Sequence, residues 1–497
     1  MFQLFDLLGT PRPAIINFVR RPFSHPLMLG HIMSQTAPTD GSTDGPFVDR
    51  QHVDNCAADS PLAGSHKVDN RRKFIRGSSL LIASALPAAG LAVASSALSA
   101  AAASTSSQPS TPSLTSTSPQ QREVKLGLIG CGFRGTNVIS SLLASQPYDR
   151  RWQLTAVADA FPDRMQQALR GLKGKFPQQV TVDSEARCLG LAGYQLLLQQ
   201  DVDLVVLATP PAFRPEHFEA AVAAGKHVYA EKPIAIDVEG VRRFQAANLR
   251  AVAQGLVVSV GWPRHQQSQF DATLDQLRSG AIGHIESARA LQNVRPPTSA
   301  TSNKPQAERD SQAERAVQLR NWTRHSWASG GPSVEPQVHN LDTMNWLFGT
   351  HPVAARPAGA GTLSGIVGLE DFCNGSRLPA DRGHNQPVEF LYANGVSLLS
   401  HCQLVEAPQP ARRVLTVHGT RGHCDLIAGK IFDSAGRLAW RAPQIASDSG
   451  QFDSLIDALG GGSQFNQVDA AVEATLTAIL GRTASSLGQR VEWDEVA

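Results

Sequence analysis

Residues 130–135 read Gly-Cys-Gly-Phe-Arg-Gly and separate a short apolar run at 124–129 from a stretch of helical composition at 136–144. A G-x-G-x-x-G turn between a strand and a helix is typical of a site for the diphosphate of a dinucleotide. The first glycine allows the tight turn, the second lets the diphosphate approach the backbone, and the third lets the helix pack on the strand. The diphosphate would lie at the helix N-terminus. The turn therefore predicts five cofactor-binding residues, which are Gly130, Gly132, Phe133, Arg134 and Gly135.

An acidic residue ends the next predicted strand, at 154–158. Asp159 is placed to accept hydrogen bonds from the hydroxyl groups of the adenosine ribose. A carboxylate at this point repels a 2′-phosphate, so we expect NAD as the cofactor, while Arg164 nearby keeps NADP possible. The alternative interpretation is a glycine-rich turn beside a surface aspartate.

Strand-like runs alternate with helical stretches over the residues that follow. Further strands are predicted at 202–208 and 228–230, with a helix at 215–224 between them. This order predicts an α/β Rossmann domain, in which a parallel, doubly wound sheet has helices on both faces. We expect this domain to span residues 121–243.

The remaining residues, 244–497, are expected to form a second domain. Helices are predicted at 238–253 and 268–278, and strands at 257–260, 285–291 and 414–418. Asn394-Gly395 lies between two apolar runs and predicts a hairpin over 388–399. Residues 300–317 are polar and are expected to form a surface loop. These features predict an α+β domain with an antiparallel sheet.

The first 120 residues differ in composition from the rest. Arg71-Arg72 precede Lys73-Phe74-Ile75 and a weakly apolar run at 78–103, an order that resembles a twin-arginine export signal. Residues 104–120 are almost wholly Ser, Thr, Pro and Gln, as in a linker. We expect the twin-arginine machinery to export the protein to the periplasm or beyond, and translation could begin at Met33. The alternative is a chance basic pair before an alanine-rich stretch.

The overall charge and the cysteines argue against several classes of partner. A formal net charge of +2 gives no reason to expect nucleic acid or an anionic membrane as partner. The six cysteines form no C-x-x-C pair, so neither a disulfide framework nor a zinc site is expected, and we predict no metal.

Two loops after predicted parallel strands carry further candidate residues. Thr209-Pro210 follows one strand, and Glu231-Lys232 followed by Pro233 comes after the next. The carboxyl ends of parallel strands are where such sheets bind ligands, so we assign all four of these residues to the cofactor site. Lys232 could also donate to a substrate hydroxyl; the alternative is a solvated charge at a strand end.

These motifs together resemble the Gfo/Idh/MocA oxidoreductase family. The resemblance rests on Gly-Cys-Gly-Phe-Arg-Gly, Ala-Thr-Pro-Pro, Ala-Gly-Lys-His-Val and Glu-Lys-Pro, and it extends from about Val124 to the C-terminus. It implies a Rossmann domain followed by a domain with a large, mostly antiparallel open sheet, through which a homodimer or homotetramer would assemble. It also implies that Lys232 binds the nicotinamide ribose and the reacting hydroxyl.

A second signature of this family is Asp-x-x-x-His at the start of a helix. Here Glu335, His339 and Asp342 are spaced i, i+4 and i+7, so they are predicted to share one helical face. By resemblance His339 accepts the proton of the hydroxyl, while Glu335 replaces the usual Asp and is one methylene longer. The alternative is a face of solvated polar residues. The candidate substrate contacts are Arg264, His265, Trp322 and Asp342.

The expected activity is that of an NAD(P)-dependent oxidoreductase. It would transfer hydride between a tightly bound nicotinamide and a secondary hydroxyl or ketone of a sugar, inositol or glycoside. One alternative is an NAD-dependent redox glycosidase, which oxidises, eliminates, hydrates and reduces. The other is a sugar-binding protein of the same fold without turnover.

Overall fold

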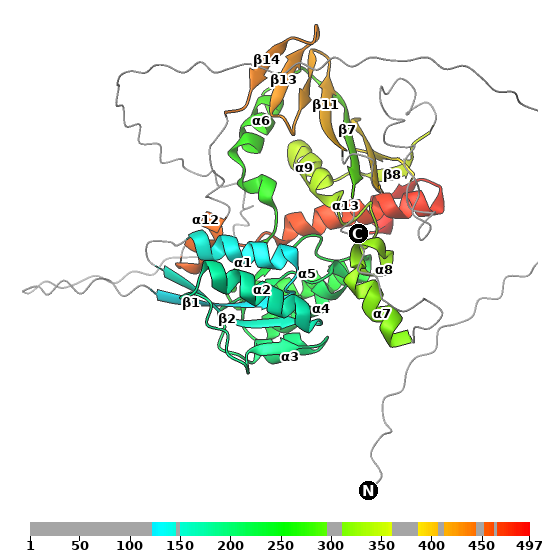
Figure 1. Ribbon diagram of the computed structural model, residues 1–497. Coiled ribbons are helices and arrows are strands. Elements are labelled where there is room, and N and C mark those ends of the chain that lie inside the picture. Colours follow the sequence, from blue (N-terminus) through cyan, green and yellow to red (C-terminus); the bar gives the residue numbers. More distant parts are fainter. Residues whose placement is uncertain are drawn as a thin grey trace, which may run out of the picture. The chain divides into compact units, whose positions relative to one another are not determined.

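The computed structural model describes residues 122–145, 150–295, 311–359, 386–405, 412–443, 452–461 and 465–497 (Figure 1). All of them belong to one compact unit, Pro109–Ala497. The expected export signal and linker lie outside the described residues. Among the described helices, none combines the length and the apolar character needed to cross a bilayer.

Six parallel strands form the first sheet, in the order β3-β2-β1-β4-β5-β6. They are β1 (Arg122–Ile129), β2 (Arg150–Asp159), β3 (Arg187–Leu189), β4 (Leu204–Leu207), β5 (His227–Ala230) and β6 (Val258–Val260). All four residues of β4 are buried, as expected for a central strand covered on both faces. The strand order reverses between β1 and β4, and that switch point is where doubly wound sheets bind ligands.

Five helices accompany this sheet. They are α1 (Phe133–Ser145), α2 (Pro162–Lys175), α3 (Gly193–Leu198), α4 (Arg214–Ala223) and α5 (Val238–Ala253). Helix α1 contacts α2, and α4 contacts α5, as expected for a sheet wound in two directions. The predicted Rossmann architecture is confirmed, and the sheet continues past residue 243 because β6 is its last strand.

Nine strands form the second sheet, in the order β14-β13-β12-β11-β7-β10-β9-β8-β15. They are β7 (Ile285–Val294), β8 (Ala354–Pro357), β9 (Val388–Leu391), β10 (Ser397–Leu404), β11 (Arg412–Gly419), β12 (Gly422–Asp425), β13 (Lys430–Asp433), β14 (Leu438–Arg441) and β15 (Val491–Glu492). Only β7 and β10 pair in parallel among these neighbours, so the predicted mostly antiparallel sheet is confirmed. The predicted hairpin is β9–β10, with Gly395 at φ 83° in its turn.

The helices of the second part are α6 (Ser268–Arg278), α7 (Ser311–Arg320), α8 (Ser326–Ser329), α9 (Val338–Phe348), α12 (Asp453–Leu459) and α13 (Val468–Leu487). Short 3-10 turns include η1 (Pro211–Phe213), η2 (Pro263–Gln266) and η4 (Trp322–Arg324). Helix α13, red in Figure 1, contacts α9, β8 and β9, and it also contacts α5. It therefore joins the second sheet to the first set of helices.

Two predictions of local structure are wrong. Residues 311–317 belong to helix α7 and not to a loop, because Ala, Glu, Gln, Leu and Arg favour helices even in a polar stretch; residues 300–310 lie outside the described part of the chain. Glu335 does not share a helix with His339, because α9 begins only at Val338 and residues 332–337 form turns. Pro336 explains this, since a proline has no backbone N–H and interrupts the run of hydrogen bonds that a continuous helix needs.

Candidate functional site

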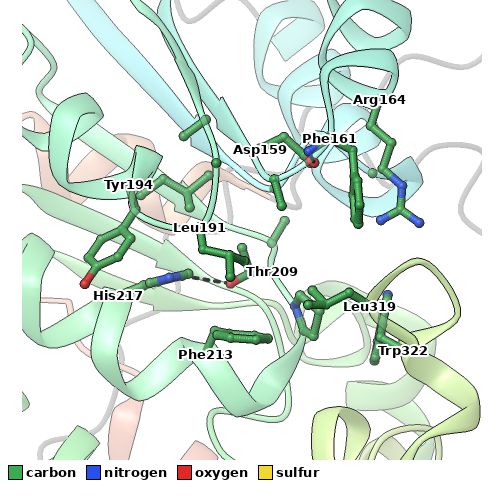
Figure 2. Close-up of a pocket in the computed structure, with 18 residues that line it drawn as sticks. Asp159, Phe161, Arg164, Leu191, Tyr194, Thr209, Phe213, His217, Leu319 and Trp322 are labelled. Carbon is green, nitrogen blue, oxygen red and sulfur yellow. Dashed lines mark hydrogen bonds between the residues drawn. The ribbon is translucent and has the colours of Figure 1, made fainter. Parts of the chain in front are cut away.

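A pocket lies at the carboxyl ends of β1, β2 and β4, where the sheet order reverses (Figure 2). Five of the predicted cofactor residues line it, and they are Gly130, Gly132, Asp159, Thr209 and Pro210.

The three glycines of the turn are required for different reasons. Gly130 has φ 101°, and a Cβ there would lie 2.7 Å from the backbone carbon of Ala208. A Cβ at Gly135 would lie 2.2 Å from the carbonyl oxygen of Gly130, so the helix can approach the strand only without a side chain. A Cβ at Gly132 would meet no atom of the protein within 4 Å. The space beside Gly132 is therefore free for a ligand, and the turn fits a dinucleotide diphosphate.

The Asp159 carboxylate is fixed by backbone donors at the edge of this pocket. Its Oδ2 accepts the N–H of Cys131 at 2.7 Å, and its Oδ1 accepts the N–H of Phe161 at 2.8 Å. Burial raises the pKa of Asp159 above its usual value, and the two N–H bonds partly oppose that effect. The carboxylate thus ties the glycine-rich turn to the end of β2.

The loops after β4 and β5 are tied together by buried arginine. Arg214 donates to the carbonyl oxygens of both Thr209 and Pro233. The Thr209 hydroxyl hydrogen-bonds His217 Nδ1 at 3.0 Å, as the dashed line in Figure 2 shows. Burial lowers the pKa of His217 to about 4, with Arg214 adding to the effect. His217 is therefore a neutral imidazole near neutral pH.

Arg134 and Glu231 form an ion pair beside the turn. Arg134 Nε lies 2.7 Å from Glu231 Oε1, and the Glu231 side chain is only 4% exposed. Glu231 also packs against Gly261, where a Cβ would lie 2.8 Å from Oε1. Glu231 therefore holds the Arg134 side chain in place. Phe133, at the start of α1, is 85% exposed and does not line the pocket.

Lys232 connects the first sheet to the signature segment of the second part. Its Nζ donates to the carbonyl oxygen of Glu335 at 2.8 Å and to Glu335 Oε1 at 3.0 Å. The Lys232 side chain is 10% exposed and that of Glu335 is 26% exposed, so the pair is partly shielded from water. Two residues that the sequence singles out separately are therefore brought together across 103 residues of chain.

His339 lies in a strongly cationic environment. Its pKa is lowered well below the usual value by burial, and the positive charges of Lys232, Arg264, Arg134 and Arg413 add to this. Its ring packs edge-on against Trp262, with the ring centres 5.7 Å apart. Within the described ranges no side chain or backbone group hydrogen-bonds the imidazole, so its nitrogens remain available. The imidazole can therefore act as a proton acceptor.

Arg264 and His265 on η2 hold helix α9 in place. Arg264 donates to the carbonyl oxygen of His339 at 2.9 Å, to Asn340 Oδ1 at 2.8 Å and to Thr343 Oγ1 at 3.0 Å. His265 Nε2 lies 2.8 Å from Asp342 Oδ2, and its ring stacks on Trp346. These contacts give both residues and Asp342 a positioning role, while their direct contact with a substrate stays a prediction.

Trp322, which the sequence assigns to the substrate, does not lie beside His339. It lines the pocket beside Gly132 and Asp159, together with Leu319, as Figure 2 shows. The sequence did not single out the other side chains of this lining, which include Phe161, Leu191, Tyr194 and Phe213. Phe161 could have been found from its place two residues after Asp159, whereas Leu319 depends on the unexpected helix α7.

Arg413 is a further candidate that sequence reasoning missed. It lies on β11 opposite Gln292 of β7, and Gln292 Oε1 accepts a hydrogen bond from Asn340 on α9. The described residues contain no group of three or more His, Cys, Asp or Glu that could hold a metal ion. Each described cysteine, at 131, 188, 402 and 424, is buried as a free thiol.

Residues 124–262 match the model of the Gfo/Idh/MocA family, which is described as an oxidoreductase family with an NAD-binding Rossmann fold. Over 247 residues the chain is 28% identical to inositol 2-dehydrogenase of Rhizobium meliloti (strain 1021), covering 49% of this chain and 61% of that protein. Over 178 residues it is 27% identical to 1,5-anhydro-D-fructose reductase of Ensifer adhaerens, covering 36% and 47%. The chain thus spans less than two thirds of the length of these relatives.

Solved structures share the fold over a longer stretch. Aldose-aldose oxidoreductase from Caulobacter crescentus superposes with a TM-score of 0.53 at 18% identity, covering 75% of this chain and 100% of that one. Levoglucosan dehydrogenase, in complex with NADH and levoglucosan, gives a TM-score of 0.53 at 18% identity and covers 75% and 99%. Residues 124–262 therefore match the Gfo/Idh/MocA model of an NAD-binding Rossmann fold, and the solved structures share the fold of this chain.

Proposed function

We propose that the protein is an NAD-dependent oxidoreductase that interconverts a secondary hydroxyl and a ketone on a sugar, inositol or glycoside. The observation that carries the proposal is the Lys232–Glu335 contact. It holds the loop after β5 against the segment that leads into α9, so an ammonium and the His339 imidazole serve one site. Lys232 and the pocket-lining Thr209 follow neighbouring strands, β5 and β4.

The protein's own groups supply binding and proton transfer. Lys232 Nζ has three donors, of which Glu335 takes two, and the third can bind the substrate oxygen. The positive charge stabilises negative charge on that oxygen as its proton leaves. His339 is the proposed acceptor of the proton, because its lowered pKa keeps it neutral and able to take a proton. When bound, NAD takes up or delivers the hydride at the same carbon.

A sugar-like substrate is supported by the relatives and by the chemistry of the site. The printed names of similar proteins include an inositol dehydrogenase and an anhydrofructose reductase. One structural neighbour was solved with levoglucosan. The Lys232 ammonium and the His339 imidazole are groups that hydrogen-bond the hydroxyls of such a ring.

We also propose export and assembly. The Arg71-Arg72 pair and the apolar run after it support a twin-arginine signal and a periplasmic or extracellular location. An exported enzyme would have to recycle its NAD, which favours a tightly held cofactor. The large second sheet is the proposed surface of a homodimer or homotetramer. N-terminal sequencing of the mature protein and light scattering test these two proposals.

The function is tested on the purified mature protein in two steps. First, mass spectrometry identifies any nucleotide that denaturation releases, and NAD is expected. Second, a panel of sugars, inositols and glycosides is screened for oxidation or reduction, with His339→Gln as the inactive variant and the exposed His284→Gln as its matched control. Protein that neither carries nor binds NAD would refute the proposal.

The same screen separates the two alternatives. If a chromogenic glycoside released free sugar and this release depended on bound NAD, the activity would be that of a redox glycosidase and not of a dehydrogenase. Binding of a sugar without turnover in the wild-type protein would leave a sugar-binding protein. Both outcomes contradict the proposed reaction.

A further inference from the structure

We propose that residues 311–324 form a latch that retains the dinucleotide, and that the Arg320–Asp163 ion pair keeps the latch closed. The proposal deepens the proposed function and rests on it, since it assigns the residues that make NAD slow to enter and slow to leave. The latch consists of helix α7 and the turn η4.

The latch forms one wall of the dinucleotide pocket. Leu319 and Trp322 line the pocket from this segment, while Asp159 lines it from the end of β2 and Tyr194 from α3. Figure 2 shows Leu319 and Trp322 on the side of the pocket away from Tyr194. Two distant parts of the chain form the walls of one pocket. A ligand there is retained by its own contacts with the protein and also by the contacts that hold the two walls together.

The closing contact is a two-pronged ion pair. Arg320 Nη1 donates to Asp163 Oδ2 at 2.8 Å, and Nη2 donates to Oδ1 at 2.7 Å. This fork-to-carboxylate geometry is the strongest form of surface ion pair. Arg320 is the last residue of α7, and Asp163 lies in the first turn of α2. The pair therefore fastens the end of the latch to the helix that follows Asp159.

Phe161 strengthens the same contact. The Arg320 guanidinium lies 4.0 Å from the centre of the Phe161 ring, and that of Arg164 lies 5.1 Å from it. Arg164 Nη2 also donates to the carbonyl oxygen of Arg320 at 2.9 Å. Cation–π contacts at this range are favourable, so the aromatic ring, which itself lines the pocket, binds the latch.

A second set of contacts holds the latch on its other side. Trp327 Nε1 donates to Gln318 Oε1 at 3.1 Å, and the Arg315 guanidinium lies 4.0 Å from a Trp327 ring centre. Trp327 also meets Phe213, which lines the pocket, edge-on at 6.4 Å. Helix α7 is thus fixed toward α8 as well, so breaking the Arg320 contacts frees one end of the latch without removing it.

Leu191 indicates what the latch encloses. This side chain lines the pocket and is 62% exposed, so it offers apolar surface to a ligand there. It lies after β3, beyond the ribose-binding Asp159, where an apolar ring of the nucleotide would cover it. The latch therefore closes over the adenosine half of NAD.

The test compares Asp163→Asn and Arg320→Ala with wild type and with Arg490→Ala. Arg490 is a matched control, because it also forms a two-pronged surface pair, with Glu492, and makes no contact with the pocket. NADH-loaded protein is mixed with excess NAD⁺, and the loss of energy transfer from tryptophan to bound NADH gives the release rate. Mixing nucleotide-free protein with NADH gives the association rate.

We expect Arg320→Ala, which loses the bidentate pair and a cation–π contact, to release NADH about tenfold faster, and Asp163→Asn, which loses the pair alone, to release it about threefold faster. Because the Arg320–Asp163 pair joins protein to protein, association is expected to quicken too, so the equilibrium affinity changes less than either rate. Arg490→Ala is expected to match wild type in both rates. Without nucleotide, all three variants are expected to have melting temperatures close to that of the wild type.

Three results would overturn the latch. Unchanged release in Asp163→Asn would do so even if Arg320→Ala failed to fold, since Asn preserves the shape of Asp. Faster release with unchanged association would show that these residues bind the nucleotide directly. Wild-type protein that binds no NADH at all would instead remove the proposed function itself, so the two failures are told apart.

Discussion

The second and third glycines of the turn give a prediction that separates ligand space from protein packing. A methyl group at Gly132 would meet no protein atom within 4 Å, and its backbone φ is not positive. Gly132→Ala should therefore change the free energy of unfolding by no more than about 0.5 kcal/mol, because lost cap preference and reduced unfolded-state entropy nearly cancel. Gly135→Ala differs, since its Cβ would lie 2.2 Å from the Gly130 oxygen and 2.9 Å from Leu128 Cδ1.

Gly132→Ala should thus weaken nucleotide binding, whereas Gly135→Ala should lower the stability of the fold. The methyl of Gly132→Ala would push the diphosphate off the backbone N–H groups, and losing one charged hydrogen bond of about 1.5–3 kcal/mol weakens NAD binding by about 10- to 100-fold. Gly135→Ala forces α1 away from β1, which should cost about 1–3 kcal/mol of stability without nucleotide.

Urea unfolding of nucleotide-free protein measures the free energy of unfolding, and NADH titration by fluorescence measures the affinity for the nucleotide. Gly171, a helical glycine whose added Cβ would also meet nothing within 4 Å, provides the control Gly171→Ala. If Gly132→Ala bound NADH as tightly as wild type, the diphosphate could not lie at this turn. If it unfolded easily, the glycine would be needed for the fold and not for the ligand.

Further predictions concern three titratable side chains of the site. Lys232→Met keeps the apolar stem but removes the ammonium, so kcat/KM should fall about 100- to 1,000-fold in steady-state assays while NADH still binds. His339→Gln should lower the oxidation rate at least about 100-fold, and added imidazole should restore part of it. In wild type the acidic limb of the oxidation profile should lie below pH 6.5, since burial and cations lower the pKa of His339. His217 has a pKa lowered to about 4, so as pH falls below 6.5 the unfolded chain binds a proton that the folded chain refuses. This group alone should lower stability by about 2 kcal/mol from about pH 8 to pH 5, and His217→Gln should remove that part of the slope in urea titrations.

The first sheet could be predicted because its signals are local. The strand before the turn, the three glycines and Asp159 lie within one stretch of chain, and each has a role that its own backbone or burial enforces. Helices α5 and α6 were predicted at their observed bounds, since an apolar period with clear ends is a local property. Distant parts of the chain are not needed to explain these elements.

The candidate site depends on contacts that no local pattern contains. Glu335 reaches Lys232 because Pro336 keeps it out of α9, whereas spacing alone placed it on the helical face of His339. Trp322 was expected beside the substrate, but α7 carries it to the dinucleotide pocket. In both cases the backbone conformation of the neighbouring residues determines the position of the side chain, and the spacing of residues in the sequence does not predict that conformation.

The role of His339 depends on charges that the sequence shows only as separate residues. Arg264 is held by three uncharged acceptors, the His339 carbonyl, Asn340 and Thr343, so no contact carboxylate offsets its charge. Lys232 and Arg134, by contrast, each have a glutamate partner. The field at the imidazole is therefore positive on balance, and with burial it disfavours the imidazolium. A neutral imidazole accepts the hydroxyl proton, and the same field then favours passing that proton on to water, which returns the site to its starting state.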